Sequence, residues 1–171
     1  MLQKGKEYWE EIILPNFWQS FSHFNNSEIK VLDVGSFDVN GNIRDLIESS
    51  NYQYTGLDIV DGPNVDVVAP SEYSFPFPDN YFDLVASSYC MEHVKNLQKW
   101  INECVRVLKH KGMIAIITHH NYKFHPHPVD CWRMMPDGFK YLFDENGSLH
   151  KYQIDMYSET DIAGIAIKKG E

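Results

Sequence analysis

The most constraining feature of this sequence is a pair of acidic residues at the ends of two successive apolar runs. A turn from Asp33 to Gly41 follows the first run, and Asp58 ends the second, 25 residues beyond Asp33 (58 minus 33). Open parallel sheets bind ligands beyond the carboxyl ends of their strands, where an acid can accept the two hydroxyls of a ribose. The pair therefore predicts an open α/β sheet that binds a nucleoside cofactor.

Apolar runs of strand length alternate with stripes of helical spacing along the chain. The expected strands are residues 29–34, 52–57, 65–68, 81–88, 113–118, 151–157 and 162–168. Helical spacing covers residues 43–47 and 97–108, and Pro136 is suited to begin a short helix over 137–143. The polar turn 158–161 joins the last two strands, which predicts an antiparallel hairpin at one sheet edge.

The chain has the length of a single domain. With 171 residues, of which 43% are hydrophobic and 14% aromatic, it can bury one sizeable core. Aromatic residues recur at helical spacing before and after Pro15. We therefore expect one domain spanning 1–171, in which residues 1–28 form an N-terminal helical cover.

Charge and cysteine usage limit the partners. A formal charge of −9 leaves no broad basic surface for phosphates, so we expect a small substrate and no nucleic-acid partner. No apolar stretch reaches the roughly 20 residues that cross a bilayer, so no membrane partner is expected. Three widely spaced cysteines indicate reduced thiols and a cytoplasmic protein. Assembly into a homo-oligomer is left open.

Four motifs occur in an order that unrelated sheets would seldom supply. They are the Asp33-x-Gly35 turn, Asp58, the proline-rich segment 75–85, and Met91-Glu92-His93-Val94 after the expected fourth strand. Together they resemble the class I S-adenosylmethionine-dependent methyltransferases, and most closely the small type 11 group, over residues 31–108. The resemblance implies S-adenosyl-L-methionine as cofactor. It also implies a Rossmann-like three-layer α/β sandwich, whose seven-stranded, mostly parallel sheet ends in an antiparallel C-terminal hairpin.

One residue departs from the usual turn of that family. Phe37 stands two residues after Gly35, where a second glycine is usual. A turn of the Gly-Ser-x-Asp-Val-Asn-Gly kind is familiar in the type 11 group, so the change should be tolerated. The backbone at Phe37 should then avoid the left-handed region, where a side chain costs on the order of 1 kcal/mol or more.

The resemblance implies a cofactor site at the tips of the first four strands. Asp33 would receive the methionine ammonium, Asp58 the ribose hydroxyls, and Ile59 the adenine face. Ser71 or Glu72 would meet the adenine amino edge. The full set of expected cofactor contacts is Asp33, Gly35, Ser36, Phe37, Asn40, Asp58, Ile59, Ser71, Glu72, Ser87, Ser88 and Tyr89. Turn or cap hydrogen bonding is the alternative role of the two acids.

Imidazoles gather beyond the expected fourth and fifth strands. A histidine is the natural proton acceptor for a hydroxyl substrate, and His119 and His120 are favoured here over His93. The alternative role of His93 is to hold its helix to the loop behind it. The segment after them is expected to be an acceptor lid, with contacts from His125, His127, Asp130, Trp132 and Arg133.

The same lid carries groups that are competent to ligate a metal, among them Asp130 and Cys131. No paired CxxC accompanies them, and methyl transfer needs no metal. We therefore expect no metal site, and hydrogen bonding within an ordered loop is the alternative role of the lid histidines.

These features together predict an enzyme that methylates a small-molecule acceptor, at a hydroxyl rather than a nitrogen. Two alternatives remain. A NAD-dependent Rossmann oxidoreductase also has an acid after its second strand, although it would normally show G-x-G-x-x-G. A catalytically inactive S-adenosylmethionine-binding module would keep the pocket without turnover.

Overall fold

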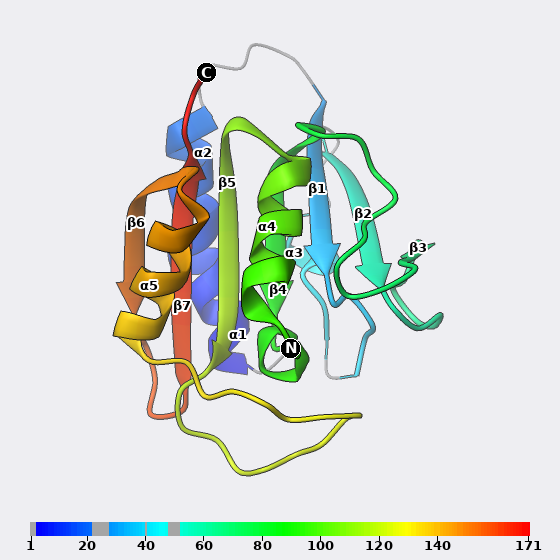
Figure 1. The fold of residues 1–171 in the computed structure, drawn as a ribbon, viewed down its shortest axis with the longest axis vertical. Coiled ribbons are helices and arrows are strands. Elements are labelled where there is room, and N and C mark those ends of the chain that lie inside the picture. The colour runs from blue at the N-terminus through cyan, green and yellow to red at the C-terminus, as the bar shows by residue number, and fades with distance from the viewer. Residues whose placement is uncertain (1–2, 22–27, 40, 48–51) are drawn as a thin grey trace.

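A computed structural model describes residues 3–21, 28–39, 41–47 and 52–171. Its centre is a seven-stranded sheet in the order β3-β2-β1-β4-β5-β7-β6 (Figure 1). The strands are β1 (Ile29–Val34), β2 (Tyr52–Asp58), β3 (Val67–Val68), β4 (Phe82–Ser88), β5 (Leu108–His119), β6 (Leu149–Asp155) and β7 (Asp161–Lys168). Strands β1 to β5 pair in parallel, and β7 is antiparallel to both β5 and β6. The predicted mostly parallel sheet with a C-terminal antiparallel hairpin is confirmed.

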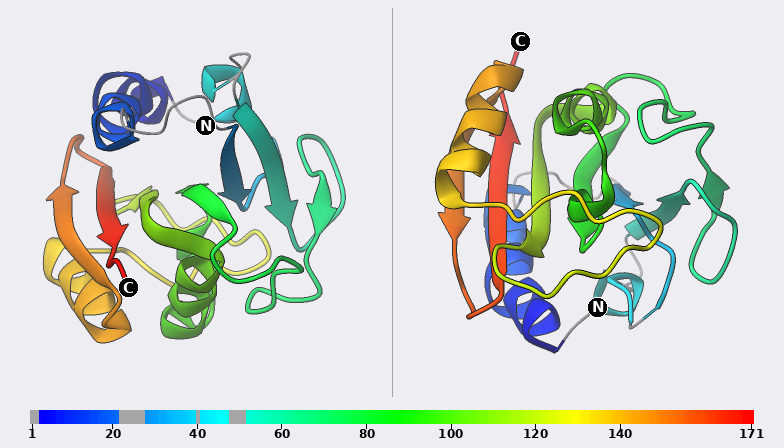
Figure 2. Two further views of the ribbon diagram at one scale, coloured as in Figure 1. Left: turned by 90° about the horizontal axis from the view of Figure 1, so that it is seen from above. Right: turned by 60° about the horizontal axis from the view of Figure 1, so that its bottom comes forward.

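Helices cover both faces of the sheet and so create three layers (Figure 2). One face carries α1 (Gln3–Tyr8), the π-helix η1 (Trp9–Ile13), α2 (Leu14–Phe21) and α3 (Arg44–Ile47). The other face carries α4 (Leu97–Val107) and α5 (Pro136–Asn146), and the short 3-10 helix η2 (Met91–His93) precedes α4. Large apolar side chains fill the two spaces between the layers, such as Trp9 on the first face and Trp100 on the second. The predicted α/β sandwich is therefore confirmed.

The central strands are buried on both faces, as their continuous apolar runs predict. All of β4 from Phe82 to Ser87 is buried. Strand β5 begins at Leu108 rather than at residue 113, because a register shift beside Phe82 lets Leu108 pair before the strand continues at Met113. Helix α4 ends one residue earlier for the same reason. Strand β3 is also shorter than predicted, and only Val67–Val68 pair with β2.

The N-terminal helices reach the end of β4 through packing contacts. Trp9 is fully buried, and its indole Nε1 donates to the hydroxyl of Ser88 (2.9 Å). Gly5 lies so close to Tyr89 that a Cβ at this position would be 2.6 Å from the phenol oxygen. These helices therefore support the strand end from behind. The polar residues 49–51, which the sequence predicts to stop the helix over 43–47, lie outside the described residues.

Within the described ranges, no helix combines the length and the apolar character needed to span a membrane. Cys90, Cys104 and Cys131 are free thiols, as expected from their odd number and wide spacing. Helix α5 begins at Pro136, as predicted, and is capped after Asn146 by Gly147, whose φ of +73° suits a residue without a side chain.

Candidate functional site

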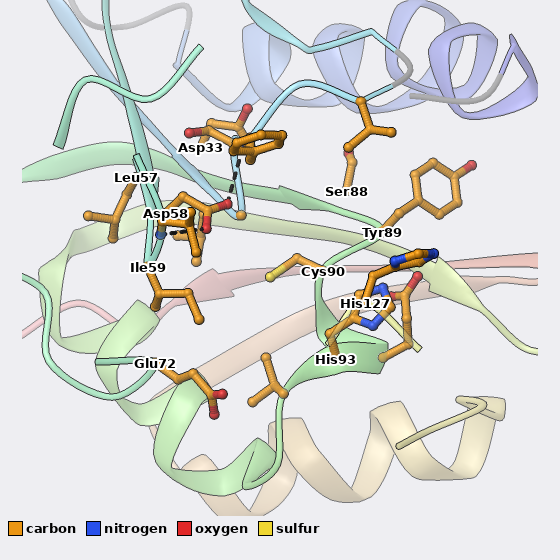
Figure 3. Close-up of a pocket in the computed structure, with 18 of the residues that line it drawn as sticks. Asp33, Leu57, Asp58, Ile59, Glu72, Ser88, Tyr89, Cys90, His93 and His127 are labelled. Carbon is orange, nitrogen blue, oxygen red and sulfur yellow. Dashed lines mark hydrogen bonds between the residues drawn. The ribbon is translucent and has the colours of Figure 1, made fainter. Parts of the chain in front are cut away.

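A cavity of about 600 Å³ opens at the carboxyl ends of the central parallel strands. Figure 3 shows Asp58 on one side of it, His93 and His127 on the other, and Cys90 between them. In Figure 1 the loop of residues 120–135 passes below the same strand ends. The volume lies within the roughly 300–1,000 Å³ that small-molecule sites occupy. The cavity is therefore large enough for a cofactor or a substrate.

The turn after β1 brings its backbone, rather than a side chain, against the segment after β4. Gly35 has a φ of +81°, and a Cβ there would lie 2.3 Å from the Cβ of Cys90. Both the conformation and the lack of space require glycine. Phe37 is not among the described residues that have a positive φ. The prediction that its backbone avoids the left-handed region is therefore confirmed. Its ring lies over Gly62, where a Cβ would be 2.2 Å from the ring.

Two backbone N–H groups hold the carboxylate of Asp58 at the tip of β2. The N–H of Phe37 donates to Oδ2 (3.1 Å) and that of Val60 donates to Oδ1 (3.2 Å) (Figure 3). Each oxygen keeps a further lone pair. Phe37 and Ile59 line the cavity beside it with 39% and 43% of their area exposed. A carboxylate next to apolar surface suits a sugar that carries a flat apolar ring.

Asp33 is a buried acid that lines the cavity. The hydroxyl of Tyr54, on the neighbouring strand β2, donates to its Oδ2 (2.5 Å). Burial raises the pKa of Asp33 to about 7. The negative charge of Asp58 raises this pKa further, whereas the Tyr54 hydrogen bond and the positive charge of Arg44 lower it. A cation entering the cavity would therefore stabilise the ionised form.

A buried acid and two histidines lie close together beyond β4 and β5. Glu92 is fully buried, and its Oε2 accepts a hydrogen bond from the hydroxyl of Thr118 (2.8 Å). Its Oε1 has no hydrogen-bond partner among the residues that the structure describes. Nε2 of His119 lies 3.6 Å and Nε2 of His125 lies 3.9 Å from this oxygen. Asp161 fixes the other ring nitrogen of His119, Nδ1, at 2.8 Å.

Most of the predicted contacts line this cavity. They are Asp33, Gly35, Ser36, Phe37, Asp58, Ile59, Glu72, Ser88 and Tyr89 of the cofactor set, and His93, His119, His125 and His127 of the catalytic and acceptor sets. The structure thus brings both sets to one cavity. Their contacts with particular ligands stay predictions.

Three predicted contacts of the cofactor and catalytic sets do not line the cavity. Ser87 is buried, and its hydroxyl donates to the carbonyl oxygen of Val34 (2.8 Å). Nε2 of His120 lies 3.0 Å from a carbonyl oxygen in the turn before β7. The hydroxyl of Ser71 accepts the backbone N–H two residues further on (3.2 Å). Each side chain is engaged with a backbone group instead. Asn40 lies outside the described residues.

Three residues of the predicted lid shape the loop and do not line the cavity. The guanidinium of Arg133 donates to both oxygens of Asp130 (2.6 and 2.8 Å), which holds the pKa of this carboxyl well below its usual range. Nε1 of Trp132 donates to the carbonyl oxygen of Val94 (2.6 Å) and so ties the loop to the segment before α4. All three side chains line a second, smaller hollow of about 260 Å³.

Cavity residues without a predicted ligand contact include Cys90, Glu92 and Tyr122. The first two follow the end of β4 directly, and their place beyond a parallel strand could have indicated both. Tyr122 stacks on His119, with ring centroids 4.1 Å apart and an interplanar angle of 9°. No local sequence pattern indicates that contact, because it depends on how the loop folds back.

Comparisons with known proteins find methyltransferases. Residues 32–116 match the family described as a methyltransferase domain. Over 44 residues the chain is 46% identical to ajmaline N-methyltransferase of Rauvolfia serpentina, which covers 26% of this chain and 15% of that protein. Over 54 residues it is 37% identical to the ubiquinone/menaquinone biosynthesis C-methyltransferase of Vibrio cholerae, which covers 32% of this chain and 21% of that protein. The chain therefore matches only about a fifth, or less, of these curated relatives.

A solved structure matches over nearly the whole chain. It is that of an S-adenosylmethionine-dependent methyltransferase from Archaeoglobus fulgidus, with a TM-score of 0.66 and 17% sequence identity. The superposition covers 98% of this chain and 100% of the other. At this level of identity the match shows a shared fold.

Proposed function

Since the chain belongs to the class I S-adenosylmethionine-dependent methyltransferases, we propose that it moves a methyl group from S-adenosylmethionine to a hydroxyl of a small-molecule acceptor. The observation that carries the proposal is a single cavity with Asp58 on one side and a cluster of histidines on the other. The relatives named above are an N- and a C-methyltransferase. The choice of oxygen therefore rests on the histidines and not on the relatives.

The lining of the cavity fits the parts of S-adenosylmethionine. Asp58 has lone pairs to accept both ribose hydroxyls, and the exposed faces of Phe37 and Ile59 offer apolar contact to an adenine ring. Asp33 is a buried acid that a methionine ammonium would stabilise as a carboxylate. Gly35 leaves the turn after β1 without a side chain at the point where its backbone lies closest to Cys90.

When bound, S-adenosylmethionine supplies a methyl carbon on a positively charged sulfur. As the acceptor oxygen bonds to that carbon, the sulfur keeps the electron pair of the broken carbon–sulfur bond. The chain contributes alignment, for which effective molarities of about 10⁵–10⁸ M are known, and a place for the hydroxyl proton. Of the three predicted bases, His119 fits best because it lines the cavity and Asp161 holds its Nδ1. Nδ1 of His93 faces the carbonyl oxygen of Val129 (2.5 Å), and His120 lies off the cavity.

Methyl transfer is tested by incubating the protein with a metabolite extract and isotopically labelled S-adenosylmethionine, with mass detection of products. We expect a labelled methyl ether together with S-adenosylhomocysteine. Cofactor binding without any methylated product would support the inactive module instead, and a labelled N-methyl or C-methyl product would overturn the choice of oxygen. Titration calorimetry with NAD and S-adenosylmethionine separates the oxidoreductase from the methyltransferase.

The location and partners of the chain are proposals as well. The net charge of −9 supports a small acceptor without a nucleic-acid partner. Three free thiols support a cytoplasmic location. Light scattering on the purified chain would determine whether it forms a homo-oligomer.

Asp33 is expected to make cofactor binding dependent on pH. Its raised pKa of about 7 keeps much of the group neutral near pH 6, and only the carboxylate can pair with an ammonium. Affinity for S-adenosylmethionine should therefore fall as pH decreases through 7, by about five- to tenfold between pH 7.5 and pH 6, as a single titrating group requires. Calorimetric titrations at these two values, at which the cofactor amine is largely protonated, measure the change.

The variant Asp33→Asn is the matched control, because its amide is neutral at both pH values. Its affinity should be weak and nearly constant between them. A wild-type affinity that does not change, or a variant that keeps the same pH dependence, would show that Asp33 does not receive the amine.

A further inference from the structure

We propose that Glu92, His119 and His125 bind one divalent transition-metal ion at the acceptor side of the cavity. The oxygen and nitrogen atoms that these side chains offer all lie within 4.8 Å of one another. Glu92 is fully buried, and the side chains of His119 and His125 are 4% and 20% exposed. The three residues come from η2, the end of β5 and the following loop, so the fold itself assembles the group.

The spacing of the donor atoms fits a metal better than it fits hydrogen bonds. Oε1 of Glu92 is 3.6 Å from Nε2 of His119 and 3.9 Å from Nε2 of His125, beyond the usual hydrogen-bond range. Ligands at 2.0–2.1 Å from a tetrahedral zinc are about 3.4 Å apart. Side-chain shifts of a few tenths of an ångström would therefore bring both distances from Oε1 of Glu92 to this spacing, and the two histidine nitrogens lie within 4.8 Å of each other.

The atoms that face away from this triangle are already held. Nδ1 of His119 is 2.8 Å from Asp161, and Nδ1 of His125 is 3.0 Å from the carbonyl oxygen of Lys123. Oε2 of Glu92 accepts the hydroxyl of Thr118. Acceptors on the second ring nitrogen fix the tautomer that leaves Nε2 free to bind a metal. Each ligand is thus oriented toward the same point by a partner of its own.

The free oxygen of Glu92 is the independent sign that something binds here. Oε1 has no hydrogen-bond partner among the described residues, although the side chain is fully buried. A buried carboxylate oxygen without a partner is strongly unfavourable, and a cation with two imidazole ligands would offset that cost. Since Oε1 points at Nε2 of both histidines, it lies where the third ligand of such a cation must be.

A second grouping, of His93, His125 and Asp130, is less suited to a metal. Both oxygens of Asp130 already accept hydrogen bonds from Arg133, and one also accepts the backbone N–H of His125 (2.7 Å). Nδ1 of His93 faces a carbonyl oxygen of the loop. The donors of this grouping are therefore engaged, whereas those around Glu92 are not.

Two imidazole nitrogens and one carboxylate oxygen favour zinc or a similar transition metal over magnesium or calcium. Three protein ligands leave a coordination position for a substrate, and all three residues line the cavity. A hydroxyl bound there would have a lower pKa, so its proton could leave to solvent before the oxygen accepts the methyl group. This consequence rests on the proposed function and replaces proton transfer to His119; metal binding itself does not depend on it.

Direct metal binding tests the proposal without any acceptor. After removal of metal with a chelator, the full chain is titrated with Zn²⁺ by calorimetry and with Co²⁺ by visible absorption. We expect one ion per chain, no competition from Mg²⁺, and a large loss of Zn²⁺ affinity in Glu92→Gln, His119→Gln and His125→Gln. The variant Asp161→Asn should weaken binding by about 10- to 100-fold, as the loss of an outer hydrogen bond to a ligating histidine does.

Two control variants, His110→Gln and His150→Gln, remove imidazoles that do not line the cavity and should bind Zn²⁺ as the wild type does. His125→Gln is the most informative variant, because its side chain is partly exposed and the fold should survive. Unchanged Zn²⁺ affinity in this variant would overturn the proposal, as would loss in His93→Gln with retention in His119→Gln. S-adenosylmethionine affinity of the metal-free protein, measured separately, shows whether the proposed function fails independently.

Discussion

Asp58→Ala is expected to weaken the binding of S-adenosylmethionine by about 100-fold. Hydrogen bonds to a charged group contribute about 1.5–3 kcal/mol, and this carboxylate has lone pairs for both ribose hydroxyls. The substitution also removes the acceptor of the N–H groups of Phe37 and Val60, so the turn beside the cofactor loses its support. Calorimetric titration with S-adenosylmethionine measures the loss of affinity. A second titration uses S-adenosylhomocysteine, which contains the same ribose.

Asp61→Ala is the matched control, because Asp61 is an exposed acid only three residues further along the same loop. Its affinity should stay within about twofold of the wild type, since exposed charges away from a ligand contribute little. Asp58→Asn should lie between the two, as its amide oxygen still accepts one hydrogen bond. Equal affinities of Asp58→Ala and wild type would mean that the ribose lies elsewhere, and the cofactor site inferred from the two acids would be wrong.

Strands with buried faces were predictable because their sequence shows burial directly. β1 begins and ends at Ile29 and Val34, as expected from one short apolar run. β5 begins at Leu108 instead of residue 113, since its first residues join through a register shift opposite Phe82. Such a shift depends on the pairing of two strands. A local apolar pattern carries no information about it.

Side-chain direction limited the prediction of the site. Successive residues of a strand point to opposite faces, so two neighbouring side chains can differ in whether they reach a cavity. Ser88 and His119 line the cavity, whereas Ser87 and His120 are turned to backbone carbonyls. The sequence indicated both pairs by their place at the end of a strand. Only the register of the sheet decides which member of each pair faces the ligand.

Gly35→Ala is expected to lower the free energy of unfolding by about 4 kcal/mol and to abolish cofactor binding. The residue has a φ of +81°, which costs about 1–3 kcal/mol for a side chain. The new methyl group would also lie 2.3 Å from Cβ and 2.4 Å from Sγ of Cys90, an overpacking that costs about 1–3 kcal/mol more. Urea denaturation followed by circular dichroism measures the stability, and calorimetry measures cofactor binding.

Gly147→Ala separates the two costs, because Gly147 has a similar φ of +73° but nothing within 4 Å of a Cβ in the described chain. It should lose only the strain, about 1 kcal/mol. The substitution Cys90→Gly removes both crowding atoms, so in its background Gly35→Ala should likewise cost only the backbone strain. The two substitutions should therefore be strongly coupled in a double-mutant cycle. Equal losses with and without Cys90 would show that crowding against the segment after β4 is not what requires glycine in this turn.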